Sequence, residues 1–472
     1  MDLVEQVAAA FVFGLLAVAV YRLTLHPLHH LPGPKLAAIT GFYQAYFDII
    51  QDGGFLNHLR KLHAAYGPVV RIGPNTLHFA SVKAFHDIYT SSQAFTKYRP
   101  FYESFAQPES SFTFIDPQQA RTRRALLNPL FSRRAILNLE GVVQSKVEKL
   151  VERLSAWPDK QRPVNMNLAF RCTTLDIITE YCFANCFNGL DAPDFHHPLL
   201  DAISGSLPDF WKQKHFPVLL TIIETMPEWL VLWLNPQVRP FLDYKRNMGQ
   251  QIDRLLADPE VLKAVDHETI YHHMLNPAEK HSLDQRAPLT RKMLLDEALT
   301  LIGAGTDTVG LTSTIGTFHT LYNPEIALKL KNELRSIWPD PETFASLAVL
   351  EKLPYLTAVI KESLRFAHGI VSPLPRVVGE PNAIVDGLVV PTGTAVGMSC
   401  VFLHESPEAF KDPLEFSPER WLSGDTRDME PNLAPFSKGP RMCLGSNLAW
   451  CELYLIFANV FRKLDMTIAN TT

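Results

Sequence analysis

The sequence has few cysteines, little excess charge of either sign, and no repeated or low-complexity segment. Its six cysteines are too sparse for a disulfide framework, and no two have the Cys-x-x-Cys spacing of a zinc site. With 44 Lys and Arg against 49 Asp and Glu, the formal charge is -5, which provides no basic field for nucleic acid. These absences argue against a disulfide scaffold and a nucleic-acid-binding protein. The lack of a Ser/Gly-rich hinge favours a single large body.

One long apolar run is present, Val7–Tyr21, in which fifteen successive positions carry no charge. With its flanks it approaches the roughly 20 residues that span a bilayer. Acidic residues precede it and Arg22 follows it, and positive charge stays on the cytosolic side. The alternative, a helix packed on its own domain, requires a polar face that this run lacks. We therefore predict a single-pass anchor, a proline-rich linker and a cytosolic catalytic domain, at residues 1–25, 26–40 and 41–472.

A second apolar stretch, Pro217–Pro236, is too interrupted to be a second span. Glu224, Pro227 and Glu228 lie within it, beside two tryptophans. Charged residues are costly within a bilayer, and proline interrupts a helix. We predict a helix pair that is either buried or skims the membrane surface.

The body is predicted to be mainly α with small β-sheets. Two short runs with strand composition, Pro68–Gly73 and Thr76–Ala80, flank a turn and predict a hairpin. More strand is expected within Ala383–Ser399. The longest predicted helix covers about residues 290–322 and ends at Asn323-Pro324, because proline cannot continue a helix. At 1.5 Å per residue, such a helix crosses a whole domain.

The segment Phe436–Gly445, FSKGPRMCLG, contains a cysteine in an unusual context. A lone cysteine is usually a small buried hydrophobe. Here Gly439 and Gly445 allow a tight loop whose backbone N–H groups point at the sulfur of Cys443 and stabilise its thiolate. Arg441 can pair with an anion, and Phe436 can cover one face of a flat cofactor. The ordered pattern Phe-x-x-Gly-x-Arg-x-Cys-x-Gly predicts a metal-binding thiolate.

This pattern resembles the haem-binding loop of the cytochrome P450 family. The resemblance implies the cytochrome P450 fold in a single catalytic domain, haem b as cofactor, and Cys443 as the ligand of its iron. It also implies a haem-thiolate monooxygenase that inserts one oxygen atom of O2 into a substrate and reduces the other to water. Tyr21–Thr40 and Leu301–Gly310 are similar to the microsomal class, and in particular to fungal oxygenases of terpenoid or polyketide secondary metabolism such as trichodiene-oxygenase-like enzymes.

The long helix contains AGTDT, Ala304–Thr308, near its centre. Polar residues at a buried helix centre are costly unless they are used, although Thr308 could simply bond to the carbonyl four residues earlier. By resemblance, Ala304 and Gly305 leave room for dioxygen. Asp307 and Thr308 are then an acid–alcohol pair that delivers protons.

Two further segments resemble parts of the family that support the cysteine loop. KESLR places Glu362 and Arg365 three residues apart, on one helical face. Alone this is a weak signal, because such pairs decorate many exposed helices. In order with FSPERW, it implies that Arg420 completes a buried charge network beneath the haem. Breaking one partner of such a network costs about 3–5 kcal/mol.

Three arginines are implied as partners of the haem propionates: Arg124, Arg376 and Arg441. Arginine suits bidentate pairing with carboxylates. The family usually has Trp or His four residues before the first of these arginines, where this chain has Ala120. Arg121 or Arg123 could compensate, or could face solvent or an acidic redox partner.

The resemblance also implies the partners. Because no phosphate-binding glycine loop is left to assign, electrons are expected from NADPH-cytochrome P450 reductase, with O2, an apolar small molecule and membrane lipid as the other partners. The endoplasmic reticulum membrane is the expected location, with the catalytic domain cytosolic. Only 29 residues follow Cys443, so a shortened C-terminus is expected. Two rival functions stay open: a haem-thiolate isomerase or dehydratase, which needs no Asp307-Thr308 relay, and an inactive truncated haem-binding membrane protein.

Overall fold

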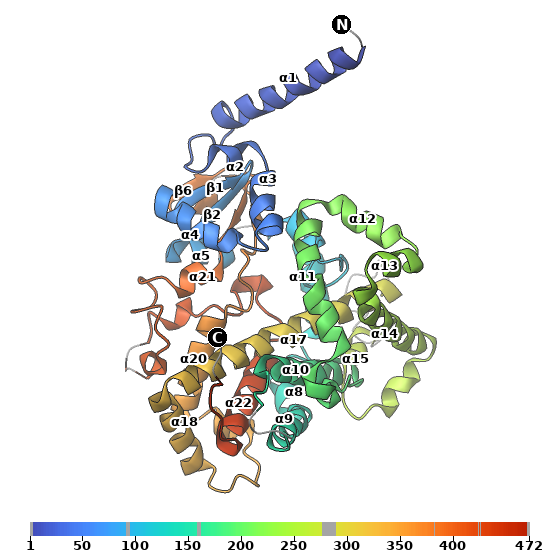
Figure 1. Cartoon of the computed structure of the whole chain (residues 1–472), viewed down its shortest axis with the longest axis vertical. Coiled ribbons are helices and arrows are strands. Elements are labelled where there is room, and N and C mark those ends of the chain that lie inside the picture. The colour runs from blue at the N-terminus through green and yellow to red at the C-terminus, as the bar shows by residue number, and fades with distance from the viewer. Residues whose placement is uncertain are drawn as a thin grey trace.

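The computed structural model describes residues 3–90, 95–157, 162–275, 289–381, 383–422, 424 and 426–469, so the last residues of the tail, 470–472, lie outside it. The chain is mainly helical with two small sheets, as predicted (Figure 1). The helices are α1 (Leu3–Thr24), α2 (Lys35–Ile39), α3 (Phe42–Ala45), the π-helix η1 (Tyr46–Ile50), α4 (Phe55–Tyr66), α5 (Val82–Tyr89), α6 (Arg99–Glu103), α7 (Pro117–Leu127), α8 (Arg133–Asn138), α9 (Glu140–Ser155), α10 (Met166–Phe183), α11 (Pro198–His215), α12 (Pro217–Thr225), α13 (Glu228–Leu234), α14 (Arg239–Ala257), α15 (Ile270–Leu275), α17 (Arg291–Tyr322), α18 (Pro324–Ile337), α19 (Leu347–Leu350), α20 (Pro354–Ala367), α21 (Cys400–His404) and α22 (Ser446–Lys463). The strands are β1 (Val69–Gly73), β2 (Thr76–Phe79), β3 (Phe95–Lys97), β4 (Arg376–Val378), β5 (Ala383–Val385), β6 (Leu388–Val390) and β7 (Ala395–Gly397).

Helix α17 crosses the middle of the body, as its predicted length required (Figure 1). It begins where the Thr290 hydroxyl accepts a hydrogen bond from the Met293 N–H at 3.2 Å. It ends at Tyr322, because Pro324 starts the next helix and the Asn323 side chain caps that next helix. Helix α10 packs along one side of α17, and helix α20 packs along another side of α17. The centre of α17 is therefore held in place by two further long helices.

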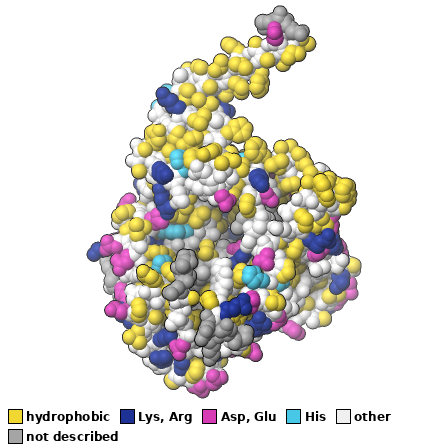
Figure 2. Space-filling model, viewed as in Figure 1, with side chains coloured by type: hydrophobic (Ala, Val, Ile, Leu, Met, Phe, Trp, Pro, Cys, Tyr) yellow, Lys and Arg dark blue, Asp and Glu magenta, His cyan; other side chains and the backbone are white. Residues whose placement is uncertain are grey.

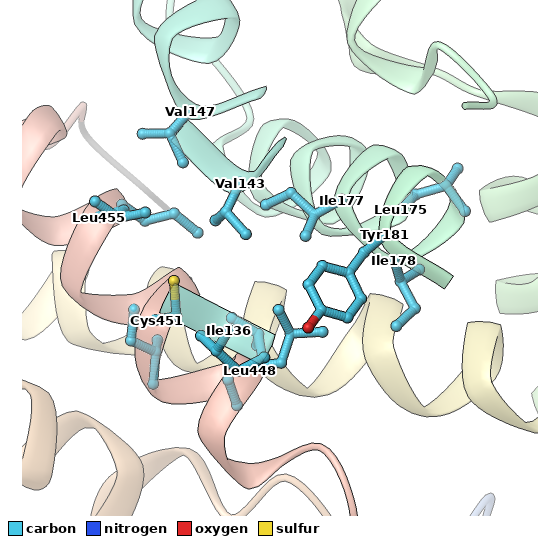
Figure 3. Close-up of a cluster of buried hydrophobic side chains, with 14 of the residues drawn as sticks. Ile136, Val143, Val147, Leu175, Ile177, Ile178, Tyr181, Leu448, Cys451 and Leu455 are labelled. Atoms are coloured by element: carbon cyan, nitrogen blue, oxygen red, sulfur yellow. The ribbon is translucent and has the colours of Figure 1, made fainter. Parts of the chain in front are cut away.

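The main core lies where α8, α9, α10 and α22 meet beside α17 (Figure 3). Its side chains converge from segments far apart in sequence, among them Val143, Ile177 and Leu455. Each large aliphatic side chain buried in this way contributes about 1.5–3 kcal/mol. The Tyr181 hydroxyl is satisfied because it donates to the Leu130 carbonyl at 2.8 Å. This core fixes the start of α22, the helix that follows the cysteine loop.

The larger sheet has the order β1-β2-β7-β4-β3. The predicted hairpin is confirmed, since β1 and β2 pair in antiparallel register with Val69 opposite Phe79. The strands expected within Ala383–Ser399 also form: β7 joins this hairpin in parallel, and β5 and β6 form the second sheet.

The predicted linker, 26–40, packs on the larger sheet. Leu28 is fully buried, and the Arg71 N–H donates to the Pro32 carbonyl at 2.7 Å. The Arg71 guanidinium also donates to the carbonyl of Arg22, at the end of α1, at 2.9 Å. A Cβ at Gly33 would lie 2.4 Å from the Arg71 carbonyl oxygen, so only glycine allows this approach. This segment is thus a docked part of the body.

Two apolar elements lie outside the core. Helix α1 is long and apolar enough to cross a membrane and has no buried residue among those described. The helix pair predicted at 217–236 is present as α12 and α13, and neither contains a buried residue, so its predicted burial alternative is wrong. Figure 2 shows hydrophobic side chains along α1 and over the upper right of the body, where Figure 1 places α12 and α13.

Candidate functional site

The segment around Cys443 forms a tight loop at the start of α22. The Cys443 N–H donates to the Phe436 carbonyl at 2.8 Å and closes the loop. Gly439 has a positive φ of 70°, and a Cβ there would lie 2.1 Å from the Tyr89 carbonyl oxygen. Glycine is therefore required at 439 for both conformation and space. The Phe436 ring packs beside Trp450, with centroids 6.3 Å apart.

The environment of the Cys443 thiol combines burial with thiolate-stabilising groups. Cys443 has exposed surface, yet burial raises its pKa, while the Gly445 N–H and the Arg124 charge act to lower it. The N-terminus of α22 begins three residues later and adds a favourable dipole.

Four cationic side chains gather near this loop: Lys97, Arg124, Arg376 and Arg441. Burial, followed by the charges of Arg376 and Arg124, lowers the pKa of Arg441 to about 10. Burial and the three arginines hold the pKa of Lys97 well below its usual value. None of the four forms an ion pair with a carboxylate in the described part of the chain. We call these four residues the cation cluster.

The cation cluster is held by backbone carbonyls and one phenol. Arg441 donates to the carbonyls of Ser111 and Phe114 at 3.1 and 2.9 Å. Arg376 donates to the Tyr102 hydroxyl at 2.5 Å. These neutral acceptors position Arg376 and Arg441 without adding an opposite charge, whereas Glu297 and Cys443 act on the Arg124 charge from a distance. The cluster therefore has the composition of an anion site that takes more than one carboxylate.

Lys97 is the member of this cluster that sequence reasoning missed. It is the last residue of the short strand β3, and its ammonium donates to the Phe112 carbonyl and lies 4.0 Å from the Tyr102 ring centre. Of the two residues considered as substitutes for the missing partner at Ala120, Arg123 is engaged elsewhere, since it pairs with buried Glu297 at 3.2 Å. Arg121 is exposed, and Ala120 itself is fully buried.

The centre of α17 presents a small-residue face. Gly303 and Ala304 are exposed although most neighbouring helix positions are buried, and a Cβ at Gly303 would meet nothing within 4 Å. Gly305 lies differently: a Cβ there would approach the Ile178 side chain on α10 to 2.7 Å. The space expected from Gly305 is therefore used for helix packing, and the open positions are Gly303 and Ala304.

Asp307 and Thr308 do not bond to each other. The Thr308 hydroxyl donates to the Ala304 carbonyl at 2.9 Å, the local bond considered as the alternative to a catalytic role. Asp307 accepts from the Arg171 guanidinium at 2.6 Å, and Arg171 also donates to the Ser204 hydroxyl on α11 at 3.0 Å. Consecutive helix residues point in different directions. The acid thus faces α10 and α11, away from its neighbour.

Glu362, Arg365 and Arg420 form one buried network. The Glu362 carboxylate accepts from Arg365 at 2.7 and 3.0 Å and from Arg420 at 3.0 Å. It also accepts from the Trp421 indole at 2.9 Å, and its side chain has no exposed surface. Arg365 continues to the His404 carbonyl at 2.8 Å. The network therefore joins α20 to α21 and to the segment before the cysteine loop.

A second group of metal-ligand types, His368, Cys400 and His404, has its ligand atoms within 4.8 Å of one another. The Ala434 N–H donates to Nε2 of His404 at 3.0 Å, so the proton of this neutral ring lies on Nδ1. That nitrogen donates to Nδ1 of His368 at 3.3 Å. Burial raises the pKa of Cys400 to about 12, and its thiol donates to the Ile370 carbonyl. The group is a hydrogen-bonded unit without a free lone pair on His404 for a metal.

A cysteine at a helix start, an uncompensated cation cluster and an open helix face define the class of site: a thiolate pocket for a flat cofactor that carries carboxylates. Haem b, with its iron and two propionates, fits this donor set.

The chain belongs to the cytochrome P450 family, whose profile, described as Cytochrome P450, matches residues 32–472. It is similar to a cytochrome P450 monooxygenase of Ascocoryne sarcoides, 36% identical over 469 residues, which cover 96% of this chain and 90% of that protein. It is also similar to a tryptophan 6-hydroxylase of Fusarium equiseti, 35% identical, covering 98% and 90% of the two chains. A cytochrome P450 monooxygenase of Fusarium sporotrichioides is 32% identical, covering 99% and 90%. The family resemblance and the monooxygenase class predicted from the sequence are confirmed.

Proposed function

We propose that this cytochrome P450 inserts one oxygen atom of O2 into an apolar small molecule of fungal secondary metabolism, in the terpenoid or polyketide class. Electrons come from NADPH-cytochrome P450 reductase. The observation that carries the proposal is the Cys443 loop beside a cation cluster without carboxylate partners.

Cys443 is the proposed ligand of the haem iron. The Gly445 N–H and the Arg124 charge stabilise its thiolate, and the α22 N-terminus adds to both. When bound, haem supplies the oxygen chemistry, and thiolate ligation favours cleavage of the O–O bond. Phe436 lies against Trp450 at the loop and holds it on the core.

The cation cluster is the proposed propionate site. Arg124, Arg376 and Arg441 take the roles implied by the family, and Lys97 supplies a fourth charge where Ala120 supplies no partner. Pairing with two carboxylates relieves the repulsion among four neighbouring cations, of which Lys97 and Arg376 are buried. Glu362, Arg365 and Arg420 act at a distance, since their network holds the segment that leads into the cysteine loop.

Thr308 and Asp307 are proposed to act in sequence in proton delivery. The Thr308 hydroxyl donates a hydrogen bond to the Ala304 carbonyl. Its oxygen lone pairs are then available to accept a hydrogen bond from a proton donor on the open face of α17. Asp307 has 39% of its side chain exposed, on the side of α10 and α11, where it exchanges protons with solvent. Arg171 must release Asp307 for the carboxylate to turn toward Thr308.

The proposed contacts with membrane and reductase are inferred from side chains exposed on the surface. Helix α1 is the proposed single-pass anchor in the endoplasmic reticulum membrane, at residues 1–25, with the catalytic domain, 41–472, in the cytosol. Exposed Trp229 and Trp233 on α13 are proposed to contact lipid. Arg121 is exposed on α7, the helix that carries Arg124, and offers a positive contact for an acidic reductase surface.

The test is the reduced carbon-monoxide difference spectrum of the full-length protein in membranes. The wild type should show the thiolate-type Soret band, and Cys443→Ser should lose it. The matched control Cys186→Ser, at a partly buried cysteine outside the site, should keep it. A folded wild type without the band would make the protein an inactive haem binder. Product formation without NADPH and reductase would make it an isomerase or dehydratase.

A further inference from the structure

A buried carboxylate lies near the start of α17, at Glu297, whose side chain has no exposed surface. A carboxylate in such a place is costly unless it is paired and hydrogen-bonded. The Glu297 oxygens accept from the N–H and the hydroxyl of Ser111, at 2.8 and 2.6 Å, and from the Arg123 guanidinium at 3.2 Å. Glu297 therefore joins residues 109–115, which we call the pre-α7 segment, to the helix that crosses the body.

The pre-α7 segment carries main-chain carbonyls that orient the cation cluster. The Ser111 carbonyl accepts from Arg441 at 3.1 Å, and the Phe112 carbonyl accepts from the Lys97 ammonium. The N–H of Ser111 is bonded to Glu297 while its carbonyl serves Arg441, so a single residue connects the two side chains. A displacement of this segment would thus move the acceptors of Lys97 and Arg441 together.

The second partner of Glu297, Arg123, extends the connection to α7. Its guanidinium lies 5.4 Å from the centre of the Phe114 ring and donates to the Glu109 carbonyl at 3.2 Å, so it also holds the pre-α7 segment. The next residue on α7 is Arg124, a member of the cation cluster. Burial lowers the pKa of Arg124, and the Glu297 charge is one of two that oppose this shift. Glu297 therefore acts on the cluster both through contacts and through its charge.

The preceding residue, Asp296, resembles Glu297 in burial but holds a different part of the pre-α7 segment. Asp296 is 4% exposed and accepts from the Glu109 N–H at 3.1 Å, two residues before Ser111. The same oxygen accepts from the Lys292 ammonium at 2.7 Å, four residues earlier on α17. These two bonds do not reach the carbonyls that hold the cation cluster. Asp296 thus offers a neighbouring buried carboxylate with which Glu297 can be compared.

We infer that Glu297 is a positioning residue of the cofactor site, which fixes the carbonyls that aim Lys97 and Arg441 at the carboxylates of the cofactor. Its negative charge also offsets part of the positive charge gathered there. This inference rests on the proposed function, because that proposal assigns the cation cluster to the haem propionates. The hold of Glu297 on the pre-α7 segment stands on its own contacts.

The inference is tested on the full-length haem-loaded protein in detergent. Glu297→Gln keeps the size of the side chain, but its amide N–H groups meet the donors of Ser111 and Arg123. Transfer of haem to apomyoglobin should become about tenfold faster, because the propionate partners are no longer held. The reduction potential, measured by spectroelectrochemistry, should move to a more positive value, because a negative charge near the iron loop is lost.

The matched control is Asp296→Asn, which removes a buried negative charge from the adjacent residue. Haem transfer should stay at the wild-type rate in this variant, because its bonds do not reach the cation cluster. Wild-type haem transfer in Glu297→Gln, or equal acceleration in both variants, would overturn the inference.

A milder variant separates positioning from folding. Ser111→Ala removes one hydrogen bond to Glu297 without changing charge. It should speed haem transfer about threefold and leave the reduction potential unchanged.

Amide hydrogen exchange reports on the pre-α7 segment itself. Exchange at residues 110–114 should be faster in Glu297→Gln and in Ser111→Ala, while exchange in α10 and α22 stays at the wild-type rate. Wild-type exchange at 110–114 in Glu297→Gln, or an equal increase throughout the protein, would overturn the positioning role. Faster exchange at 110–114 in a protein that takes up no haem would keep the hold of Glu297 on this segment and count against the proposed haem function.

Discussion

Single charged residues determine the electrostatic balance of the proposed cofactor pocket. The cation cluster places Lys97 beside three arginines, and burial together with the neighbouring cations lowers the pKa of Lys97 and of Arg441. In the proposed propionate site, the same side chains that destabilise the free protein should stabilise its complex with a dicarboxylate. A substitution in this cluster should therefore have opposite effects on the two forms.

Lys97→Met keeps the length of the side chain and removes its charge. The haem-free protein should become more stable, by on the order of 1 kcal/mol, because repulsion falls. Haem affinity should fall about tenfold, because one partner of the carboxylates is lost. Thermal unfolding of the haem-free form and haem titration measure the two effects. Lys83→Met, at a surface pair with Asp87, should change neither, and equal haem affinity in Lys97→Met would contradict the assignment.

Thr308→Val removes the hydroxyl on the open face of α17 and keeps the shape of the side chain. The Soret band should persist, while product per NADPH falls at least about tenfold and peroxide rises, because proton delivery fails. Thr312→Val is the matched control, since its hydroxyl also bonds to a helix carbonyl, that of Thr308, but is buried. If both variants formed the same amount of product per NADPH, the Thr308 hydroxyl would have no role beyond its hydrogen bond to the Ala304 carbonyl.

The geometry of two parts of the candidate site could be predicted from local sequence pattern. The loop around Cys443 and the Glu362-Arg365 spacing could be read directly, because the chemistry lies within a few positions. Lys97 could not be found this way, since its neighbours in the cluster come from segments far apart in the chain. Gly305 was expected to leave room for dioxygen, whereas in the structure it faces Ile178 on α10, because a helical motif does not show which of its residues meet the neighbouring helix.

Among the elements, α17 and α10 show how two glycines of one motif serve different purposes. Gly305→Ala should lower stability by about 1–3 kcal/mol, because its methyl group meets Ile178. Gly303→Ala should not lower stability and should gain about 0.5–1 kcal/mol of helix propensity. The second variant should instead alter ligand-induced spectra, because residue 303 faces the pocket. If the two variants had similar melting temperatures, α10 and α17 would have shifted enough to accommodate the added methyl group.

Element types followed from periodicity and from proline and asparagine signals, which is why α17 and the β1–β2 hairpin were predicted with nearly correct ends. Strands β3 and β4 were missed because three residues carry no periodic signal. The parallel pairing of β2 with β7 joins segments about 320 residues apart, which no local pattern specifies. Whether residues 217–236 were buried or exposed depended equally on tertiary packing.

At the scale of the whole molecule, the proposed contacts with lipid are made by α1 and by the helix pair α12–α13. Removing residues 1–25 should leave partial membrane binding through the helix pair. Adding Trp229→Ser and Trp233→Ser should then lower vesicle partitioning at least about tenfold. Vesicle co-sedimentation measures this. The control pair Leu328→Ser and Phe344→Ser changes exposed apolar side chains elsewhere and should leave partitioning unchanged.

The cation cluster also links the abundance of this enzyme to cofactor supply. In the proposed site, four cationic side chains lie together until the haem carboxylates pair with them, so the folded form should be populated less before haem binds than after. Quality-control proteases degrade the unfolded form. Cells short of haem should therefore contain less of this polypeptide at the same rate of synthesis, and feeding a haem precursor should lengthen its half-life.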